Sequence, residues 1–399
     1  MSRLSPTAER VQRSGVREIV NLAMARPGTI RLEIGEPDFP TPAHIVAAAA
    51  TSAATWSGYV QSAGTPQLRE AARDGLARRH GLDLPADRIV VCQGAGQGLA
   101  AVLAATVSAG DEVLVPDPAW PNYEMQAVLL GATAVHYRLD AARGFQPDVG
   151  EIGRLITPRT RVLVLNSPSN PTGTCLDPGT VAAIVWLAAE RGVLVVSDEV
   201  YDEITFEGAA ANAVALDPDN VVGVYSLSKT YAMTGWRVGY LAVPPWLAGK
   251  VAQMQEPLLS SVSSVTQAAA VAALTGPQDC VAAMRETYRA RRDSTLALLA
   301  DNGIAPVRPT AAFYLMVPLA AGVDSRAAAL SLLDDGVATA PGSAFGTVAA
   351  DQLRLSLASA EADLRTGVER IAAWYRRTGA GADLGAAWNA VPAGRPAHR

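Results

Sequence analysis

The chain has 399 residues, of which 49% are hydrophobic, and a formal net charge of −5. At roughly 150 residues per domain, this length predicts two to three domains and a large buried core. The negative net charge argues against a nucleic-acid-binding surface, since such surfaces are usually basic. Three widely spaced cysteines indicate a reducing compartment, which we take as the cytoplasm, and they offer no metal-ligand spacing. The polar N-terminus argues against a signal peptide, and the lack of any run of about 18 apolar residues argues against a membrane span.

The first 40 residues are predicted to be short and irregular, and they end in the turn-rich stretch 35–40. They carry arginines that could form a nucleic-acid-binding arm, although solvated charges on a helix are the favoured interpretation. These are Arg3, Arg10, Arg13, Arg17, Arg26 and Arg31. Helices are predicted next over residues 42–55 and 66–80, and Gly81 stands where a C-terminal cap would.

From residue 88 onward, short apolar runs alternate with helical stretches. Strands are expected over residues 88–92, 112–115, 134–137, 161–165, 193–196 and 221–225, and helices over 96–108, 122–130, 148–156 and 178–190. Several strands are apolar on both faces, which is typical of a parallel sheet covered by helices. The alternation therefore predicts an α/β fold with a mostly parallel, doubly wound sheet.

A second, smaller α+β domain is predicted after a long helix over residues 276–302. Its strands are expected over 313–317 and 352–357, and its helices over 326–333 and 360–377. The segment 379–399 is rich in Gly, Ala and Pro, which predicts a loosely held tail. We divide the chain into a large domain (42–280), a small domain (1–41 plus 281–378) and the tail (379–399).

Polar side chains follow three of the predicted strands. Asn170 lies in an Asn-Pro-Thr-Gly segment, Asp198 precedes Tyr201 by three residues, and Lys229 lies in a serine-flanked loop. Open α/β sheets bind ligands at the carboxyl ends of their strands. Alternatives exist for each residue, since Asp198 could cap a helix, Asn170 could serve only a turn, and Lys229 could be a solvated cation.

Taken as an ordered set, these residues resemble the pyridoxal-phosphate aminotransferases of the aspartate aminotransferase family, which have fold type I. The set is Asn170, Asp198, Tyr201, Lys229, Arg237 and Arg354, and the resemblance runs from about Ile30 to about Trp374. It implies a transaminase that binds pyridoxal 5′-phosphate in the large domain and forms a homodimer with shared active sites.

The resemblance assigns a role to each residue around the cofactor ring. Lys229 would carry the cofactor as a Schiff base and then move a proton at the substrate α-carbon. Asp198 would pair with the pyridine nitrogen and keep it protonated, which makes the ring an electron sink. Tyr201 and Asn170 would hydrogen-bond the phenolic oxygen, and Trp120 would stack on the ring, although a tryptophan is more often part of a core.

The cofactor phosphate is expected at the segment 93–98, which follows a strand and opens a helix, since backbone N–H groups at a helix N-terminus bind phosphate. The contacts implied by the resemblance are Ala95, Gly96, Ser226, Ser228, Arg237 and, reaching in from the neighbouring subunit, Tyr59. For the substrate, the resemblance implies that Arg354 grips the α-carboxylate through two bonds, with Asn170 and the backbone of Gly35 beside it. An arginine at a strand edge that faces solvent is the alternative.

The resemblance implies a ping-pong transfer of the amino group from an L-amino acid to a 2-oxo acid, with 2-oxoglutarate as the expected acceptor. A carbon–sulfur β-lyase, a cyclopropane-forming synthase or an oxidase would keep the same residues and stays open. A cofactor-sensing regulator would need a DNA-binding domain, for which the residues before Pro42 are too few. A nicotinamide oxidoreductase is disfavoured, because Leu99 stands where the dinucleotide fingerprint requires its third glycine.

Overall fold

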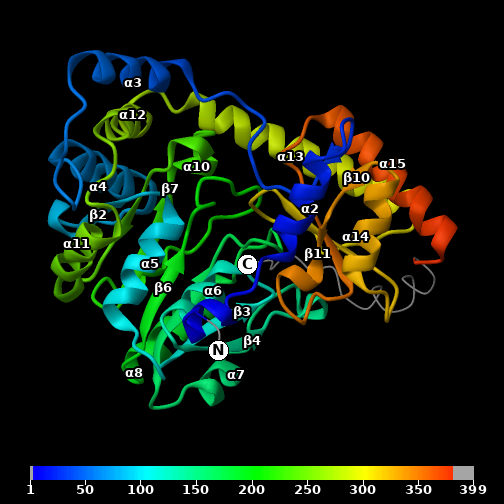
Figure 1. Ribbon diagram of the computed structural model, residues 1–399, viewed down its shortest axis with the longest axis horizontal. Coiled ribbons are helices and arrows are strands. Elements are labelled where there is room, and N and C mark those ends of the chain that lie inside the picture. Colours follow the sequence, from blue (N-terminus) through cyan, green and yellow to red (C-terminus); the bar gives the residue numbers. More distant parts are fainter. Residues whose placement is uncertain (1–2, 381–399) are drawn as a thin grey trace, which may run out of the picture.

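The computed structural model describes residues 3–380, and a seven-stranded sheet forms the centre of its larger part (Figure 1). The strands run in the order β2-β8-β7-β6-β5-β3-β4. They are β2 (Ile89–Cys92), β3 (Glu112–Asp117), β4 (Thr133–Arg138), β5 (Thr160–Asn166), β6 (Leu194–Asp198), β7 (Val221–Ser226) and β8 (Gly239–Ala242). Neighbours from β7 through β4 are parallel, whereas β8 is antiparallel to both β2 and β7. The prediction of an α/β fold with a mostly parallel sheet is confirmed.

Side chains of this sheet alternate between two hydrophobic clusters, one on each face. In β5, Val162 and Val164 belong to one cluster, and Leu163 and Leu165 to the other. The first face is covered by α5 (Ala95–Thr106), α6 (Asn122–Leu129) and α11 (Pro245–Leu259), and the second by α3 (Ala43–Thr55), α4 (Pro66–His80), α7 (Val149–Leu155), α8 (Pro178–Glu190), α9 (Ala213–Leu216) and α12 (Ser264–Thr275). Because helices cover both faces, the inner strands β5, β6 and β7 are mostly apolar, whereas the edge strand β4 carries the exposed residues Thr133, His136 and Arg138.

Helices α4 and α8 have the bounds that the sequence predicts, because their ends carry strong signals. Helix α4 begins at Pro66 after the capping side chain of Thr65, and it is followed by Gly81 at a φ of +64°. Helix α8 begins at Pro178 after the capping carboxylate of Asp177. Proline at the first position of a helix forfeits no internal hydrogen bond, and glycine adopts the left-handed conformation without strain.

A second sheet of three antiparallel strands, in the order β11-β12-β9, belongs to the C-terminal part of the chain. Its strands are β9 (Tyr314–Pro318), β11 (Ala340–Pro341) and β12 (Gln352–Ser356), and the helices around it are α13 (Asp279–Ala300), α14 (Ser325–Asp334) and α15 (Glu361–Thr378). Beside it, β1 (Ile30–Arg31) pairs in parallel with β10 (Val337–Ala338). This pairing of the N-terminal segment with the C-terminal part agrees with the proposed domain division, which stays a prediction. Of the predicted tail, residues 381–399 lie outside the described residues.

The N-terminal segment is more regular than predicted. It contains α1 (Pro6–Arg10) and α2 (Gly15–Met24), and α2 buries Ile19 and Ala23 in the hydrophobic cluster of the smaller sheet. The apolar residues Val16, Ile19, Val20 and Ala23 of α2 have the spacing of one helix face, a signal that the sequence analysis overlooked. No helix within residues 3–380 is both long and apolar enough to cross a membrane.

The sequence analysis also missed the elements between residues 226 and 276, namely β8, α11 and α12. Strand β8 begins with Gly239, and α11 contains Pro257, and both residue types weaken the expected patterns. Lys229 lies in the single-turn helix α10 (Leu227–Thr230) and not in a loop as predicted. The turn forms because the Ser226 side chain accepts a hydrogen bond from the N–H of Ser228.

Candidate active site

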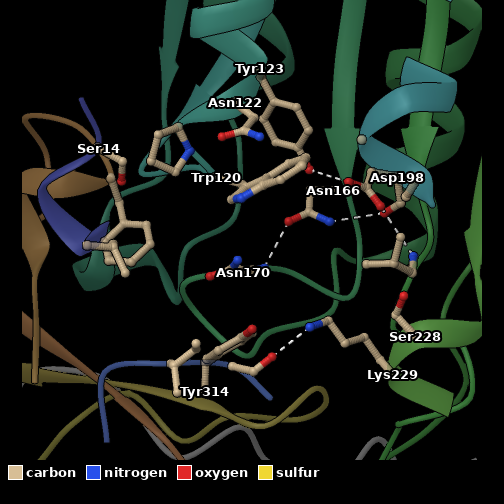
Figure 2. A pocket seen from close by; sticks show the side chains of 18 of the residues that line it. Ser14, Trp120, Asn122, Tyr123, Asn166, Asn170, Asp198, Ser228, Lys229 and Tyr314 are labelled. Atoms are coloured by element: carbon tan, nitrogen blue, oxygen red, sulfur yellow. Dashed lines mark hydrogen bonds between the residues drawn. The ribbon is translucent and has the colours of Figure 1, made fainter. Parts of the chain in front are cut away.

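A cavity of about 570 Å³ opens at the carboxyl ends of β5, β6 and β7 (Figure 2). Among its lining residues are Gly35, Ala95, Gly96, Trp120, Asn170, Asp198, Tyr201, Ser226, Ser228, Lys229, Arg237 and Arg354. The structure therefore brings together every site residue that the sequence predicts except Tyr59. Tyr59 lies in the loop between α3 and α4, where it is 89% exposed.

Asp198 is the last residue of β6, and its carboxylate is buried at the cavity wall. Its Oδ2 accepts a hydrogen bond from the Tyr123 hydroxyl at 2.6 Å, and its Oδ1 accepts one from the N–H of Val200 at 3.3 Å. Burial raises the pKa of Asp198 to about 6, while these two hydrogen bonds favour the ionised form. A cationic partner that enters the cavity would further stabilise the ionised form of this carboxylate.

Two asparagines tie the end of β5 to the end of β6. The Asn166 amide donates to the carbonyl oxygen of Asp198 at 3.0 Å, and its Oδ1 accepts from the N–H of Asn170 at 2.8 Å. The Oδ1 of Asn170 in turn accepts from Nη1 of Arg354 at 2.9 Å. The Asn170 amide group is thus held in place between the two sheets.

Lys229 extends its amine into the cavity from α10. Its Nζ donates to the carbonyl oxygen of Gly35 at 2.6 Å. The pKa of Lys229 is lowered to about 8, mainly by burial and further by the charges of Arg354 and Arg237, whereas Glu36 opposes the shift. The neutral, nucleophilic amine is therefore accessible near physiological pH.

An anion-binding cradle forms where α5 begins. Ala95 and Gly96 are its first two residues, and their N–H groups have no acceptor within the helix. Gly94, at a φ of +75°, leaves room for the Arg237 guanidinium, since a Cβ atom there would lie 2.5 Å from Nη2. Helix N-termini and arginine side chains both favour phosphate groups.

Arg354 lies in the middle strand of the smaller sheet and is only 3% exposed, so it is not a solvent-facing edge residue. Its Nη2 donates to the carbonyl oxygen of Glu33, and its buried Nε has no partner among residues 3–380. The guanidinium carbon lies 4.5 Å from the Tyr314 ring centroid and 4.7 Å from that of Phe345. A planar guanidinium held in this way suits a carboxylate.

Three further cavity residues, Tyr123, Asn166 and Tyr314, were not predicted. Asn166 is the last residue of β5, just as Asp198 is the last residue of β6, and the two are paired in the sheet. The rule that ligands bind at the carboxyl ends of strands could therefore have identified Asn166. Tyr123 and Tyr314 carry no such signal, because an aromatic residue in a helix or strand usually belongs to a core. Arg13 and Arg17, which were interpreted as solvated charges, also line the cavity.

The donor set fits pyridoxal phosphate, the cofactor that the sequence resemblance implies. The cavity holds a buried carboxylate, an amine of lowered pKa and an anion-binding cradle. The unpartnered Nε of Arg354 is a further buried donor that awaits an acceptor. Each group suits one partner: the carboxylate suits the ring nitrogen, the amine suits the aldehyde, the cradle suits the phosphate, and Arg354 suits a substrate carboxylate.

Comparison with known proteins agrees with this geometry. The family described as "Aminotransferase class I and II" matches residues 27–371. A probable N-acetyl-LL-diaminopimelate aminotransferase of Bacillus subtilis is 35% identical over 372 residues, covering 92% of this chain and 94% of that protein. Arginine–pyruvate transaminase of Pseudomonas aeruginosa is 38% identical over 347 residues, covering 86% and 88%. The solved structure of aspartate aminotransferase from Thermus thermophilus with maleate has a TM-score of 0.89 at 35% identity, covering 94% of this chain and 100% of that one.

Proposed function

The chain belongs to the class I and II aminotransferases, which depend on pyridoxal phosphate, and on this premise we propose that it transfers the amino group of an L-amino acid to a 2-oxo acid in a ping-pong cycle. The proposed acceptor is 2-oxoglutarate. The observation that carries the proposal is the Lys229 amine, which has a pKa of about 8 and opens into the same cavity as Asp198 and Arg354.

When bound, pyridoxal phosphate supplies an electron sink that stabilises negative charge at the substrate α-carbon. We propose that Lys229 binds it as a Schiff base and that Asp198 holds the ring nitrogen protonated. Trp120 would lie against the ring, and Tyr201 and Asn170 would donate to its phenolic oxygen. The phosphate would be bound by Ala95, Gly96, Ser226, Ser228 and Arg237.

The amine of Lys229, once free, would accept the proton of the substrate α-carbon and would deliver it to the cofactor carbon. Its lowered pKa supports this exchange, because a base with a pKa near the working pH is effective in both directions. Arg354 would hold the substrate α-carboxylate, with the backbone N–H of Gly35 as a second donor.

A half-reaction assay tests this proposal. Single L-amino acids, given without an oxo acid, should abolish the absorbance of the lysine-bound cofactor, and 2-oxoglutarate should restore it with one glutamate formed per site. Lys229→Ala should do neither. Release of pyruvate and ammonia from cystathionine without amino exchange would instead establish the β-lyase alternative.

Borohydride reduction identifies the lysine independently of turnover. The only other lysine, Lys250, is exposed on α11, where its Nζ contacts Gln253 at 2.7 Å. Peptide mapping of the reduced protein should find the cofactor on Lys229. Label on Lys250 would contradict the assignment.

We further propose that the protein is a cytoplasmic homodimer and that Tyr59 completes the phosphate site of the neighbouring subunit. The exposure of Tyr59 and of the nearby Trp56, at 89% and 56%, supports a contact beyond the single chain. Large apolar side chains left exposed together are typical of such interfaces.

A further inference from the structure

We propose that Tyr314 is a positioning residue that orients the hydroxyl of Tyr201 and the guanidinium of Arg354 at the same time. It would thereby couple the group that contacts the cofactor to the group that holds the substrate carboxylate. The inference rests on the proposed function, because it is there that Tyr201 and Arg354 receive these roles.

The first contact is a buried pair of hydroxyl groups. The oxygens of Tyr201 and Tyr314 lie 2.8 Å apart, and the two residues are 3% and 2% exposed. Each hydroxyl has a single proton, so only one of the pair can donate to the other. If Tyr314 donates, the proton of Tyr201 is free to point into the cavity. The Tyr201 hydroxyl is then also a stronger donor, because the hydrogen bond that it accepts from Tyr314 polarises it. An oxyanion in the cavity, such as the phenolic oxygen of the cofactor, selects this arrangement.

The second contact is between the Tyr314 ring and Arg354. The guanidinium carbon lies 4.5 Å from the ring centroid, within the range of a cation–π interaction. In the β9–β12 pair, Arg354 is opposite Met316, and Tyr314 is two residues from Met316 on the same face. The ring and the guanidinium are therefore diagonal neighbours of one sheet, which fixes their relative position.

Tyr314 also packs directly against the segment that contacts Lys229. Its hydroxyl and ring occupy the space that a Cβ atom would take at Gly35, whose carbonyl oxygen accepts from Lys229 Nζ. The ring centroids of Tyr201 and Tyr314 lie 5.6 Å apart in an edge-to-face arrangement, and the ring centroid of Phe313 lies 5.0 Å from that of Tyr314. Figure 2 shows Tyr314 on the same side of the cavity as the lysine amine. With contacts on so many sides, Tyr314 has little freedom to reorient.

The hydroxyl and the ring can be tested separately. Tyr314→Phe removes only the hydroxyl. In the resting holoenzyme it should raise the pH at which the cofactor–lysine chromophore titrates, because a weakened Tyr201 donor stabilises the phenolic oxyanion less. The net strength of one hydrogen bond corresponds to roughly 0.4–1 pKa unit. Tyr201→Phe should cause a larger rise in the same direction, and adding Tyr314→Phe to it should cause no further rise.

Tyr314→Leu removes the ring as well. It should repeat the spectroscopic shift and also raise the KM for the amino acid by about tenfold, since a buried cation–π contact is lost. Tyr314→Phe should leave this KM near that of the wild type. Thermal melting of each holoenzyme confirms that the variant is folded before its chromophore is titrated, and Tyr201→Phe probes the other hydroxyl of the pair.

Tyr288 offers a matched control. It is fully buried in the same hydrophobic cluster, its ring lies 5.1 Å from Phe313, and its hydroxyl has no partner among the described residues. Tyr288→Phe should leave both the chromophore and the KM unchanged. An unchanged chromophore in Tyr314→Phe, together with a shifted one in Tyr201→Phe, would overturn this inference and leave the proposed function intact. An unchanged chromophore in Tyr201→Phe would overturn the role proposed for Tyr201 itself.

Discussion

Asp198 shows how the environment of one residue decides its chemistry. An aspartate at the end of a strand could serve only as a cap, but here the carboxylate is buried and accepts its shortest hydrogen bond from Tyr123. The ends of the predicted strands drew attention to Asp198 and Lys229, and the family resemblance then assigned roles to Asp198, Tyr201 and Lys229. Neither signal could reveal Tyr123, because its role depends on a contact across 75 residues of sequence.

Tyr123→Phe removes the 2.6 Å hydrogen bond to Asp198 and is expected to raise the pKa of that carboxyl group above its present value of about 6. In the role proposed for Asp198, the ring nitrogen of the cofactor would pair only with the ionised carboxylate. The pH below which cofactor affinity declines should therefore move upward, by roughly 0.4–1 unit. The measurement is the dissociation constant of pyridoxal phosphate between pH 5 and 8, as a ratio of variant to wild type. A ratio that is constant across this range would contradict the role of Tyr123.

Arg354→Lys keeps the positive charge but loses the planar fork that bonds Asn170 and the Glu33 carbonyl oxygen. The charged partner proposed for this fork is the substrate α-carboxylate. Each hydrogen bond lost to it costs about 1.5–3 kcal/mol, so the KM for the amino acid should rise at least about tenfold. Cofactor affinity should change far less. Equal losses of substrate and cofactor affinity would show that Arg354 is structural.

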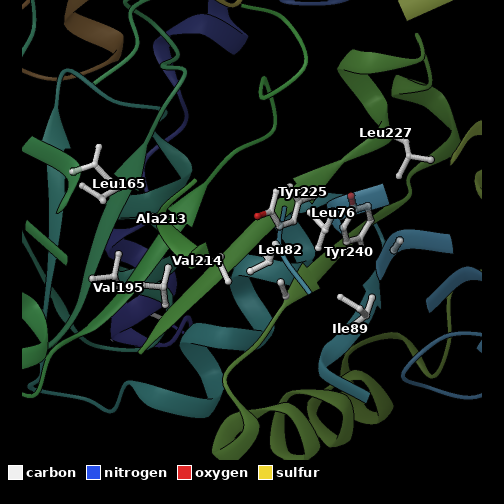
Figure 3. Packing of buried hydrophobic residues seen from close by; sticks show 14 of the residues in the cluster. Leu76, Leu82, Ile89, Leu165, Val195, Ala213, Val214, Tyr225, Leu227 and Tyr240 are labelled. Atoms are coloured by element: carbon white, nitrogen blue, oxygen red, sulfur yellow. The ribbon is translucent and has the colours of Figure 1, made fainter. Parts of the chain in front are cut away.

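At the scale of elements, the sequence predicted best where a helix or strand carries its own end signals. Helices α4 and α8 have such caps, whereas α11 contains a proline and β8 begins with a glycine, and these two were missed. The single-turn helix that carries Lys229 is too short to show a period. Its position depends on the packing of β7 and β8, where the rings of Tyr225 and Tyr240 stack at 5.2 Å (Figure 3).

The start of α5 can be tested as an element. Gly94→Ala would place a Cβ atom 2.5 Å from the Arg237 guanidinium, so it should displace this side chain and weaken cofactor binding. Gly81→Ala at the end of α4 is the control, because it has a similar positive φ but nothing within 4 Å of the added Cβ. Gly81→Ala should lose about 1–2 kcal/mol of stability from its left-handed conformation, and Gly94→Ala should lose more, because its φ of +75° and ψ of 159° lie in a region that is essentially restricted to glycine. Only Gly94→Ala should require more pyridoxal phosphate for saturation, and equal cofactor affinity in the two variants would contradict the cradle.

At the scale of the whole molecule, the two sheets supply different parts of one cavity. The larger sheet contributes Asp198, the short helix α10 that follows its strand β7 contributes Lys229, and the smaller sheet contributes Arg354 and Tyr314. The sequence predicted most strands of both sheets from their patterns, but not β8 or β11. It could not predict that Asn170 bonds Arg354 across 184 residues of chain, because nothing in a single sequence shows which distant residues meet.

A mixing experiment tests the proposed dimer with shared sites. Lys229→Ala and Tyr59→Phe proteins should each be impaired at both sites of their own dimers. Unfolded, mixed and refolded together, they should form hybrid dimers in which one site has both wild-type residues and the other has neither. Activity should then exceed that of either parent. If mass analysis confirms hybrids but activity is only the parental average, Tyr59 serves its own chain.

The cations of the cavity also determine when the site can form. Lys229 finds its carbonyl partner 194 residues away at Gly35, and Arg354 finds its own 321 residues away at Glu33. Contacts of such separation close long loops of the chain, and the entropic cost of closing long loops slows folding. A nascent chain released from the ribosome only as far as β9 has the lysine but lacks the arginine altogether. The proposed site for the substrate carboxylate is therefore complete only in the finished chain, and substrate binding can serve as a marker that synthesis and folding of the C-terminal strands are complete.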